Sequence, residues 1–142
     1  MGFKIFLDTN ILIDILAERN FELASIYKII GLSEREFVDI FLSESVITNV
    51  FYVLRKEKRI QTLPALREIC KTANLIPFSK DILYYPLEKF KDIEDGILYF
   101  MAAKAKMDYF ITRNIKDFTF LFPSLPVVTP SDFIKRISND LS

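Results

Sequence analysis

Residues 3–16 of this 142-residue chain read FKIFLDTNILIDIL, and they set a pattern that the remaining sequence repeats. The first five residues are mostly apolar, which is typical of a short strand buried on both faces of a sheet. Asp8, Thr9 and Asn10 interrupt the apolar run, and apolar side chains then return at helical spacing over residues 11–16. The stretch therefore predicts a strand, a polar turn and a helix in direct succession.

The same alternation continues to the end of the chain. Four further apolar runs predict strands at residues 38–42, 75–78, 109–111 and 126–128. Helical patterns lie between them at residues 21–30, 43–58, 62–72 and 92–106, with a broken helical segment at 79–86 and a last helix after Thr129. In this interpretation Gly31 stops the helix at 21–30, and Pro64 lies in the first turn of the helix at 62–72.

Five strands that alternate with helices predict a parallel sheet covered on both sides. The fold class is therefore α/β, a three-layer α/β/α sandwich. No linker, internal repeat or low-complexity segment divides the chain, so we expect one domain over residues 1–142.

Composition excludes several classes of function. The chain has no histidine, which excludes catalytic triads and metal sites that contain histidine. Cys70 is the one cysteine, which excludes a disulfide framework and favours a reducing, cytoplasmic location. No apolar run approaches the roughly 18 residues of a membrane span, so no membrane association is expected. Lys plus Arg and Asp plus Glu number 19 each, so binding of nucleic acid requires a local basic patch.

Polar and acidic residues follow the predicted strands. Asp8 follows the first strand, Thr112 and Asn114 follow the fourth, and Asp117 lies three residues further on. Asp92, Glu94 and Asp95 begin the helix that leads into the fourth strand. Ligands of open α/β sheets bind beyond the carboxyl ends of the strands, where these residues are expected to meet. Carboxylates without histidine or cysteine favour Mg²⁺ or Mn²⁺, so the pattern indicates an acidic metal site.

A purely structural interpretation stays open for each acid. Asp8 is in position to cap the first helix. Asp92 and Asp95 match the spacing of a capping box, and Asp117 is typical of a turn that an aspartate side chain closes.

Four segments resemble the PIN domain, and most closely the VapC-like ribonuclease toxins and their free-standing relatives. They are FLDTNILID (residues 6–14), DIEDGILY (92–99), YFITRNIKDF (109–118) and VVTP (127–130). The resemblance implies a sheet in the order 3-2-1-4-5 and cleavage of RNA that depends on Mg²⁺ or Mn²⁺. It also implies an antitoxin protein as a possible partner, and a homodimer.

The resemblance also implies roles for individual residues. By motif position the catalytic, metal-binding acids are Asp8, Asp95 and Asp117. Thr9 and Thr112 are expected to support them through hydrogen bonds, Asn114 to assist at the end of the fourth strand, and Glu94 to lie behind the metal ligands.

One position departs from the family pattern. The family usually places an acid on the helix after the second strand, and the matching residue here is Asn49. An asparagine ligates a cation only through a neutral carbonyl, which weakens the binding of Mg²⁺. Two functions therefore stay open: a metal-dependent endoribonuclease, and a weak or inactive PIN domain that binds RNA or protein.

Contacts with RNA are expected from a basic rim around the acids. Arg113 and Lys116 lie beside the predicted site, and Arg19 follows the first helix. Phe118 and Phe120 are candidates for stacking on bases.

Overall fold

The structure is a computed structural model that describes residues 2–19, 21–54, 59–118 and 125–141. The strands are β1 (Phe3–Leu7), β2 (Val38–Ser43), β3 (Asn74–Ile76), β4 (Tyr109–Ile111) and β5 (Val127–Val128). The helices are α1 (Thr9–Leu16), α2 (Leu23–Glu34), α3 (Glu44–Val53), α4 (Arg59–Thr72), α5 (Ile93–Lys104) and α6 (Pro130–Leu141). Three short 3₁₀ helices complete the described part, η1 (Lys80–Tyr84), η2 (Leu87–Lys89) and η3 (Ile115–Phe118).

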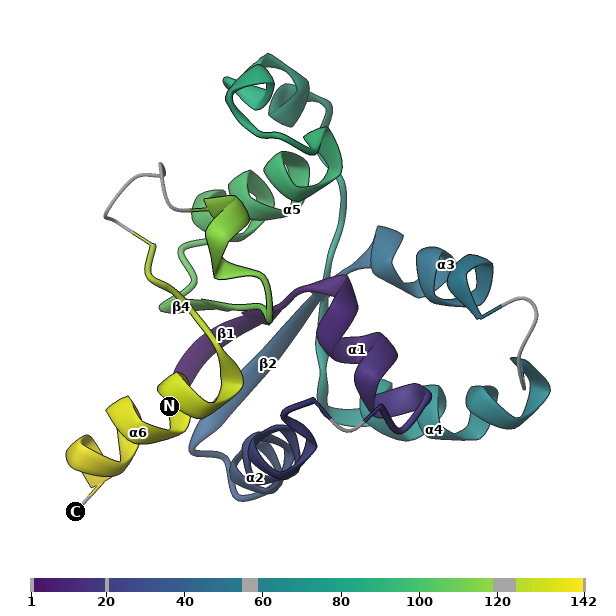
Figure 1. The fold of residues 1–142 in the computed structure, drawn as a ribbon, viewed down its shortest axis with the longest axis vertical. Coiled ribbons are helices and arrows are strands. Elements are labelled where there is room, and N and C mark those ends of the chain that lie inside the picture. Colours follow the sequence, from purple (N-terminus) through teal and green to yellow (C-terminus); the bar gives the residue numbers. More distant parts are fainter. Residues whose placement is uncertain (1, 20, 55–58, 119–124, 142) are drawn as a thin grey trace.

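The five strands form one parallel sheet in the order β3-β2-β1-β4-β5, which confirms the predicted fold class and strand order. β1 is central, and Phe6 pairs in register with Phe41 of β2 and Phe110 of β4. Figure 1 shows α5 and the 3₁₀ segments on one side of the strands, with α1, α2, α4 and α6 on the other. The ends of β1 and β4 are therefore adjacent, and whatever follows them in sequence meets at one edge of the sheet.

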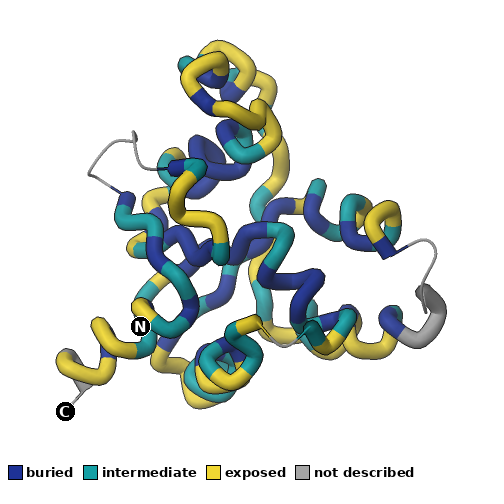
Figure 2. The backbone as a smooth tube through the Cα atoms, in the orientation of Figure 1, coloured by how far each residue is buried: buried dark blue, intermediate teal, exposed yellow. Residues whose placement is uncertain are grey.

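The core lies along the strands and along the helix faces turned toward them (Figure 2). On the α5 side it is largely aromatic. The Phe6 and Phe110 rings stack at 5.3 Å, and Tyr99 of α5 packs 6.0 Å from Phe110. Aromatic packing of this kind stabilises a core beyond the area that it buries, and it fixes α5 against β1 and β4. Over the described residues, no helix combines the length and the apolar character that crossing a membrane requires.

Helix α2 corrects one prediction, because it passes through Gly31 and ends at Glu34. The glycine has no positive φ, so it does not form the left-handed turn that ends a helix. Glu36 adopts that conformation instead, with φ of 65°. Its N–H donates to the Ser33 carbonyl at 3.1 Å, and the Phe37 N–H donates to the Leu32 carbonyl at 2.9 Å. This pair of bonds is a Schellman motif built on a glutamate, which the sequence does not signal.

The bounds of β3 and α4 also differ from the prediction. β3 ends at Ile76 because Pro77 has no N–H and the Phe78 N–H donates to the Glu44 carboxylate at 2.8 Å. α4 begins at Arg59, so Pro64 lies inside the helix and beyond its first turn. Pro64 is exposed, and water can solvate the carbonyl that the proline leaves unbonded.

The helix after β2 ends earlier than the sequence predicts. α3 ends at Val53, with the fully buried Leu54 as its C-cap, whereas the sequence predicts a helix to about residue 58. Residues 55–58 lie outside the described residues.

Substitution of Glu36 by glycine should stabilise the protein. Glycine adopts positive φ without the steric cost that a Cβ incurs, so we expect Glu36→Gly to raise the free energy of unfolding by about 1 kcal/mol. Glu34→Gly is the matched control, since Glu34 is helical and glycine there should lower stability by about 1 kcal/mol. Urea unfolding measures both. An unchanged or lower stability of Glu36→Gly would contradict the interpretation.

Candidate active site

Asp8 joins β1, β4 and α1 at the carboxyl edge of the sheet. It directly follows β1, caps α1, and is only 4% exposed. Its N–H donates to the Ile111 carbonyl at 3.0 Å. Its carboxylate accepts from the Thr9 N–H at 2.7 Å through Oδ1, and from the Thr112 hydroxyl at 2.8 Å through Oδ2. Because both oxygens are bound, the carboxylate has one fixed orientation.

Thr112 organises the loop that follows β4. The residue is fully buried, and its hydroxyl donates to Asp8. The same oxygen accepts from Asn10 Nδ2 at 3.3 Å and from the Asn114 N–H at 3.2 Å. Thr112 thus connects the residues that follow β1 with the loop that follows β4. The Asn114 side chain is exposed beside this junction, and the Asn114 backbone carbonyl accepts from the Asp117 N–H at 3.2 Å.

Asp95 lies in the first turn of α5, above the same edge of the sheet. The next residue, Gly96, is buried against the Phe90 ring, and a Cβ at Gly96 would lie only 2.8 Å from that ring. The missing side chain allows the segment around Phe90 to cover this face of the helix. Packing on Gly96 therefore fixes the start of α5, and with it the position of Asp95.

The carboxylates act on one another electrostatically. Burial, the largest cause, and the charge of Glu94 together raise the pKa of Asp8 to about 6, against the lowering effect of the hydrogen bonds that Asp8 accepts and of the Arg113 charge. Burial is also the largest cause that raises the pKa of Asp95, to about 7. Four further carboxylates add to the rise at Asp95, namely Asp8, Asp92, Asp117 and Glu94. The structure thus brings both Asp8 and Asp117 within electrostatic reach of Asp95.

Asn49 and Glu94 meet across the gap between α3 and α5. Asn49 Nδ2 donates to Glu94 Oε1 at 3.0 Å. The Glu94 N–H donates to Asp92 Oδ1 at 2.9 Å, which is the cap of α5. Asp92 therefore caps α5, as expected if its role is structural rather than metal-binding, whereas Glu94 extends toward α3.

The donor set fits a hard divalent cation. Two buried oxygens next to Asp8, Thr9 Oγ1 and Asn10 Oδ1, have no hydrogen-bond partner among the described atoms. Carboxylates whose pKa values are raised by burial and by one another are stabilised when a cation joins them. Among the described residues, no three acidic or thiol side chains are already arranged as a closed metal site.

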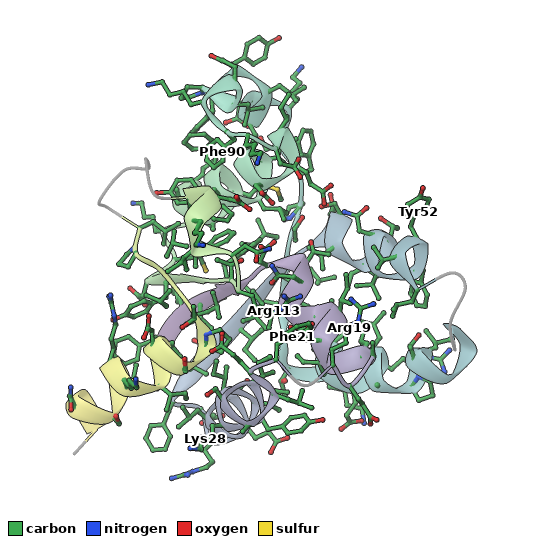
Figure 3. All side chains as sticks on the ribbon, viewed as in Figure 1. Arg19, Phe21, Lys28, Tyr52, Phe90 and Arg113 are labelled. Atoms are coloured by element: carbon green, nitrogen blue, oxygen red, sulfur yellow. The ribbon has the colours of Figure 1, made fainter. Side chains whose placement is uncertain are left out.

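The basic residues expected to bind RNA are not all exposed and free of ion pairs. Arg113 pairs with Asp14, which is fully buried in α1, through Nε at 2.5 Å and Nη2 at 3.2 Å. The Arg113 guanidinium also lies 4.3 Å from the centre of the Phe21 ring, and Figure 3 shows Arg19 near the two. Lys116 is exposed in η3.

Asp14 and Phe21 were not predicted from the sequence. An aspartate within the apolar face of the first helix is a signal for a buried partner, because an unpaired buried carboxylate is costly. Phe118 is only 4% exposed and packs 5.0 Å from the Phe110 ring, so the suggestion that it stacks on bases is wrong. Phe120 lies outside the described residues.

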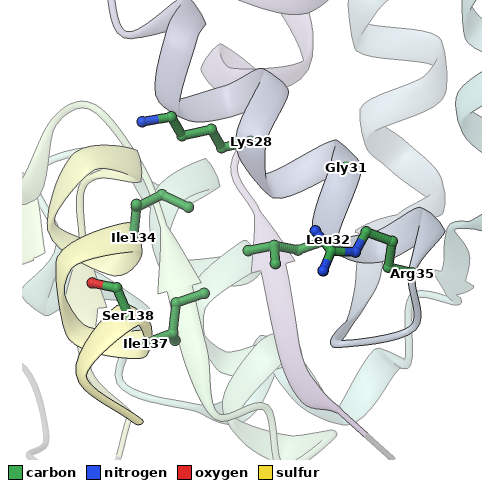
Figure 4. Close-up of a pocket in the computed structure, with 7 residues that line it drawn as sticks. All are labelled: Lys28, Gly31, Leu32, Arg35, Ile134, Ile137 and Ser138. Atoms are coloured by element: carbon green, nitrogen blue, oxygen red, sulfur yellow. The ribbon is translucent and has the colours of Figure 1, made fainter. Parts of the chain in front are cut away.

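A pocket of about 350 Å³ lies between α2 and α6 (Figure 4). Its lining is mainly apolar, with Lys28 and Arg35 at its edge. None of the predicted site residues contributes to it. The chemistry therefore concentrates at the acidic edge of the sheet rather than in this cavity.

Comparisons with known proteins agree with this geometry. The family model of the PIN domain matches residues 4–116 of the chain. Ribonuclease VapC1 of Aquifex aeolicus (strain VF5) is 29% identical over 139 residues, which cover 94% of this chain and 94% of that protein.

Solved structures of toxin–antitoxin proteins share the fold. VapBC2 from Rickettsia felis, bound to a DNA fragment from its promoter, gives a TM-score of 0.70 at 22% identity and covers 89% of this chain and 98% of its own. A toxin–antitoxin complex from Klebsiella pneumoniae gives 0.65 at 27% identity, with 89% and 97% covered. VapC20 from Mycobacterium tuberculosis, a Sarcin-Ricin loop cleaving toxin, gives 0.56 at 14% identity, with 75% and 86% covered. At 22% and 14% identity the likeness shows the fold alone.

The raised pKa of Asp95 predicts how stability depends on pH. Between about pH 4 and pH 7 the unfolded chain has lost this proton and the folded protein still holds it, so rising pH lowers the free energy of unfolding. Asp95→Asn should remove this contribution and, above pH 7, stabilise the metal-free protein by on the order of 1–2 kcal/mol, allowing for partial exposure. Urea unfolding from pH 4 to 8 with a chelator measures the difference. The exposed Glu88→Gln is the control, and a difference that does not grow with pH would refute the prediction.

Removal of Arg113 should cost far more stability than removal of a surface cation. Arg113→Ala leaves the buried Asp14 carboxylate without its partner, which should lower the free energy of unfolding by about 3 kcal/mol. Lys71→Ala is the matched control, because the Lys71–Glu68 pair is exposed and should contribute less than about 0.5 kcal/mol. Adding Asp14→Asn to Arg113→Ala should restore part of the loss. Equal effects of the two alanine substitutions would contradict this assignment.

Proposed function

This chain belongs to the PIN domain family, and from that membership we propose that it is a metal-dependent endoribonuclease, the toxin of a toxin–antitoxin pair. One observation carries the proposal: the charges of Asp8 and Asp117 both act on Asp95, so the three acids of the family motif converge on Asp95. The similarity to a ribonuclease over nearly the whole chain favours cleavage over binding without catalysis.

In this proposal the chain's own residues hold and orient the reacting groups. Asp8, Asp95 and Asp117 would hold Mg²⁺ or Mn²⁺, and the ion would supply a water molecule activated for attack on a phosphodiester. Thr112 and the Thr9 N–H fix the Asp8 carboxylate, so one ligand is oriented before the ion arrives. Asn114, exposed next to Thr112, is placed to contact the substrate.

Binding of RNA would use the rim around the acids. Lys116 and Arg19 are proposed to contact phosphates. Arg113 commits Nε and Nη2 to Asp14, which leaves Nη1 for a phosphate and makes its position rigid. An RNA substrate and the single cysteine both agree with action in the cytoplasm.

A protein partner is part of the proposal. The Klebsiella pneumoniae complex, at 27% identity over 89% of this chain, supports an antitoxin that binds this protein. A homodimer is proposed from family membership, and sedimentation of the purified chain tests it.

The decisive experiment is cleavage of a pool of single-stranded and structured RNA by the purified protein. With Mn²⁺ or Mg²⁺ we expect cleavage, and with chelator none. Asp8→Asn and Asp95→Asn should each reduce the rate at least about 100-fold, because each removes an anionic ligand while keeping the shape of the side chain.

The controls separate catalysis from contamination and from binding alone. Glu88→Gln, at an exposed residue whose charge is not among those that shift the pKa of Asp8 or Asp95, should cleave as wild type does. Cleavage that persists in both aspartate variants would refute the site. RNA binding without cleavage by the wild type would favour the inactive PIN domain.

A further inference from the structure

We propose that Glu94, held by Asn49, serves as a fourth carboxylate toward the metal ion, so that the acid missing from α3 is supplied by α5. The inference rests on the proposed function and deepens it. It revises the expected role of Glu94, which the sequence analysis places behind the metal ligands. It also gives Asn49, which stands where the family usually has an acid, the role of positioning Glu94.

The first observation is the direction in which Glu94 extends. Glu94 and Asp95 are consecutive in the first turn of α5, so their side chains diverge by about 100° around the helix. The charge of Glu94 nonetheless acts on both Asp8 and Asp95. Its Oε1 also accepts from Asn49 on α3. Glu94 therefore lies where the end of β1, the start of α5 and the middle of α3 meet.

The second observation is how the Glu94 carboxylate is held. Asn49 Nδ2 binds one oxygen, Oε1, at 3.0 Å. Among the described residues, Oε2 accepts no hydrogen bond and pairs with no cation. Asn49 thus restrains the carboxylate by one oxygen and leaves the other for a ligand. Since an amide NH₂ group is a donor, an asparagine suits this role and an acid at the same position would repel Glu94.

The third observation is the set of oxygen donors that neighbour Asp8 in the chain. Thr9 Oγ1 and Asn10 Oδ1 are buried without partners next to Asp8. Three carboxylates from Asp8, Asp95 and Asp117 give a charge of −3, and Glu94 raises it to −4. Affinity for a hard divalent cation increases with the number of anionic ligands, so the fourth carboxylate compensates for the neutral Asn49.

Binding of Mn²⁺ to the metal-free protein, measured by calorimetry without RNA, tests the inference. Glu94→Gln keeps the shape of the side chain and the acceptor for Asn49, but removes the charge. We expect it to weaken Mn²⁺ binding at least 10-fold. Asn49→Ala, which removes the restraint and no charge, should weaken binding about three- to tenfold.

Asp92→Asn is the matched control. Asp92 also raises the pKa of Asp95, and asparagine can still accept from the Glu94 N–H as the cap of α5. Asp92→Asn removes a nearby negative charge but no metal ligand, so it should change Mn²⁺ binding less than threefold. An equal loss in Asp92→Asn and Glu94→Gln would overturn ligation by Glu94, and unchanged binding in Asn49→Ala would overturn the restraint.

The outcome for the wild type separates this inference from the proposed function. If the wild type binds Mn²⁺ and cleaves RNA while Glu94→Gln binds as tightly, the role of Glu94 is refuted and the ribonuclease stands. If the wild type binds no Mn²⁺, the metal-dependent function itself fails. Circular dichroism of each variant confirms that the fold is intact.

Discussion

The hydrogen bond from Thr112 to Asp8 is the constraint on which the edge of the sheet depends. It connects residues 104 positions apart at the point where two neighbouring strands end. The bond fixes a buried carboxylate whose charged form is disfavoured by burial, and the same threonine binds Asn10 and Asn114. The residues after β1 and β4 are therefore one hydrogen-bonded unit, which fixes the position of Asp8.

Aromatic packing supplies the second requirement, which is the placement of α5. Tyr99 packs against Phe110 and Phe90 covers Gly96, so the helix that carries Asp95 is fixed at two points. The site thus combines a polar junction between two strands with an apolar contact between a helix and the sheet. Neither alone would bring acids from three separate segments to one edge.

Much of this arrangement could be read from the sequence, because local patterns predict the strands and helices and the resemblance to the PIN domain implies the strand order. The acids Asp8 and Asp95 belong to short motifs next to predicted strand and helix ends. The ion pair of Arg113 with Asp14 could not be predicted, since it depends on the packing of α1 against a loop about 100 residues away. The end of α2 was also missed: Gly31 suggests a stop, yet the helix continues to Glu34 and Glu36 takes the left-handed turn.

Two of the left-handed residues in the described part, Glu36 and Lys106, lie just before β2 and β4, at the amino edge of the sheet, and the third, Glu18, follows α1. The acids gather at the carboxyl edge. The backbone strain at Glu36 and Lys106 and the acidic side chains are therefore at opposite ends of the strands. Many enzymes trade stability for activity because their active sites hold the strained residues. For Glu36 and Lys106 the strain is spatially separated from the acids, so selection can adjust stability at the amino edge while the acidic edge stays unchanged.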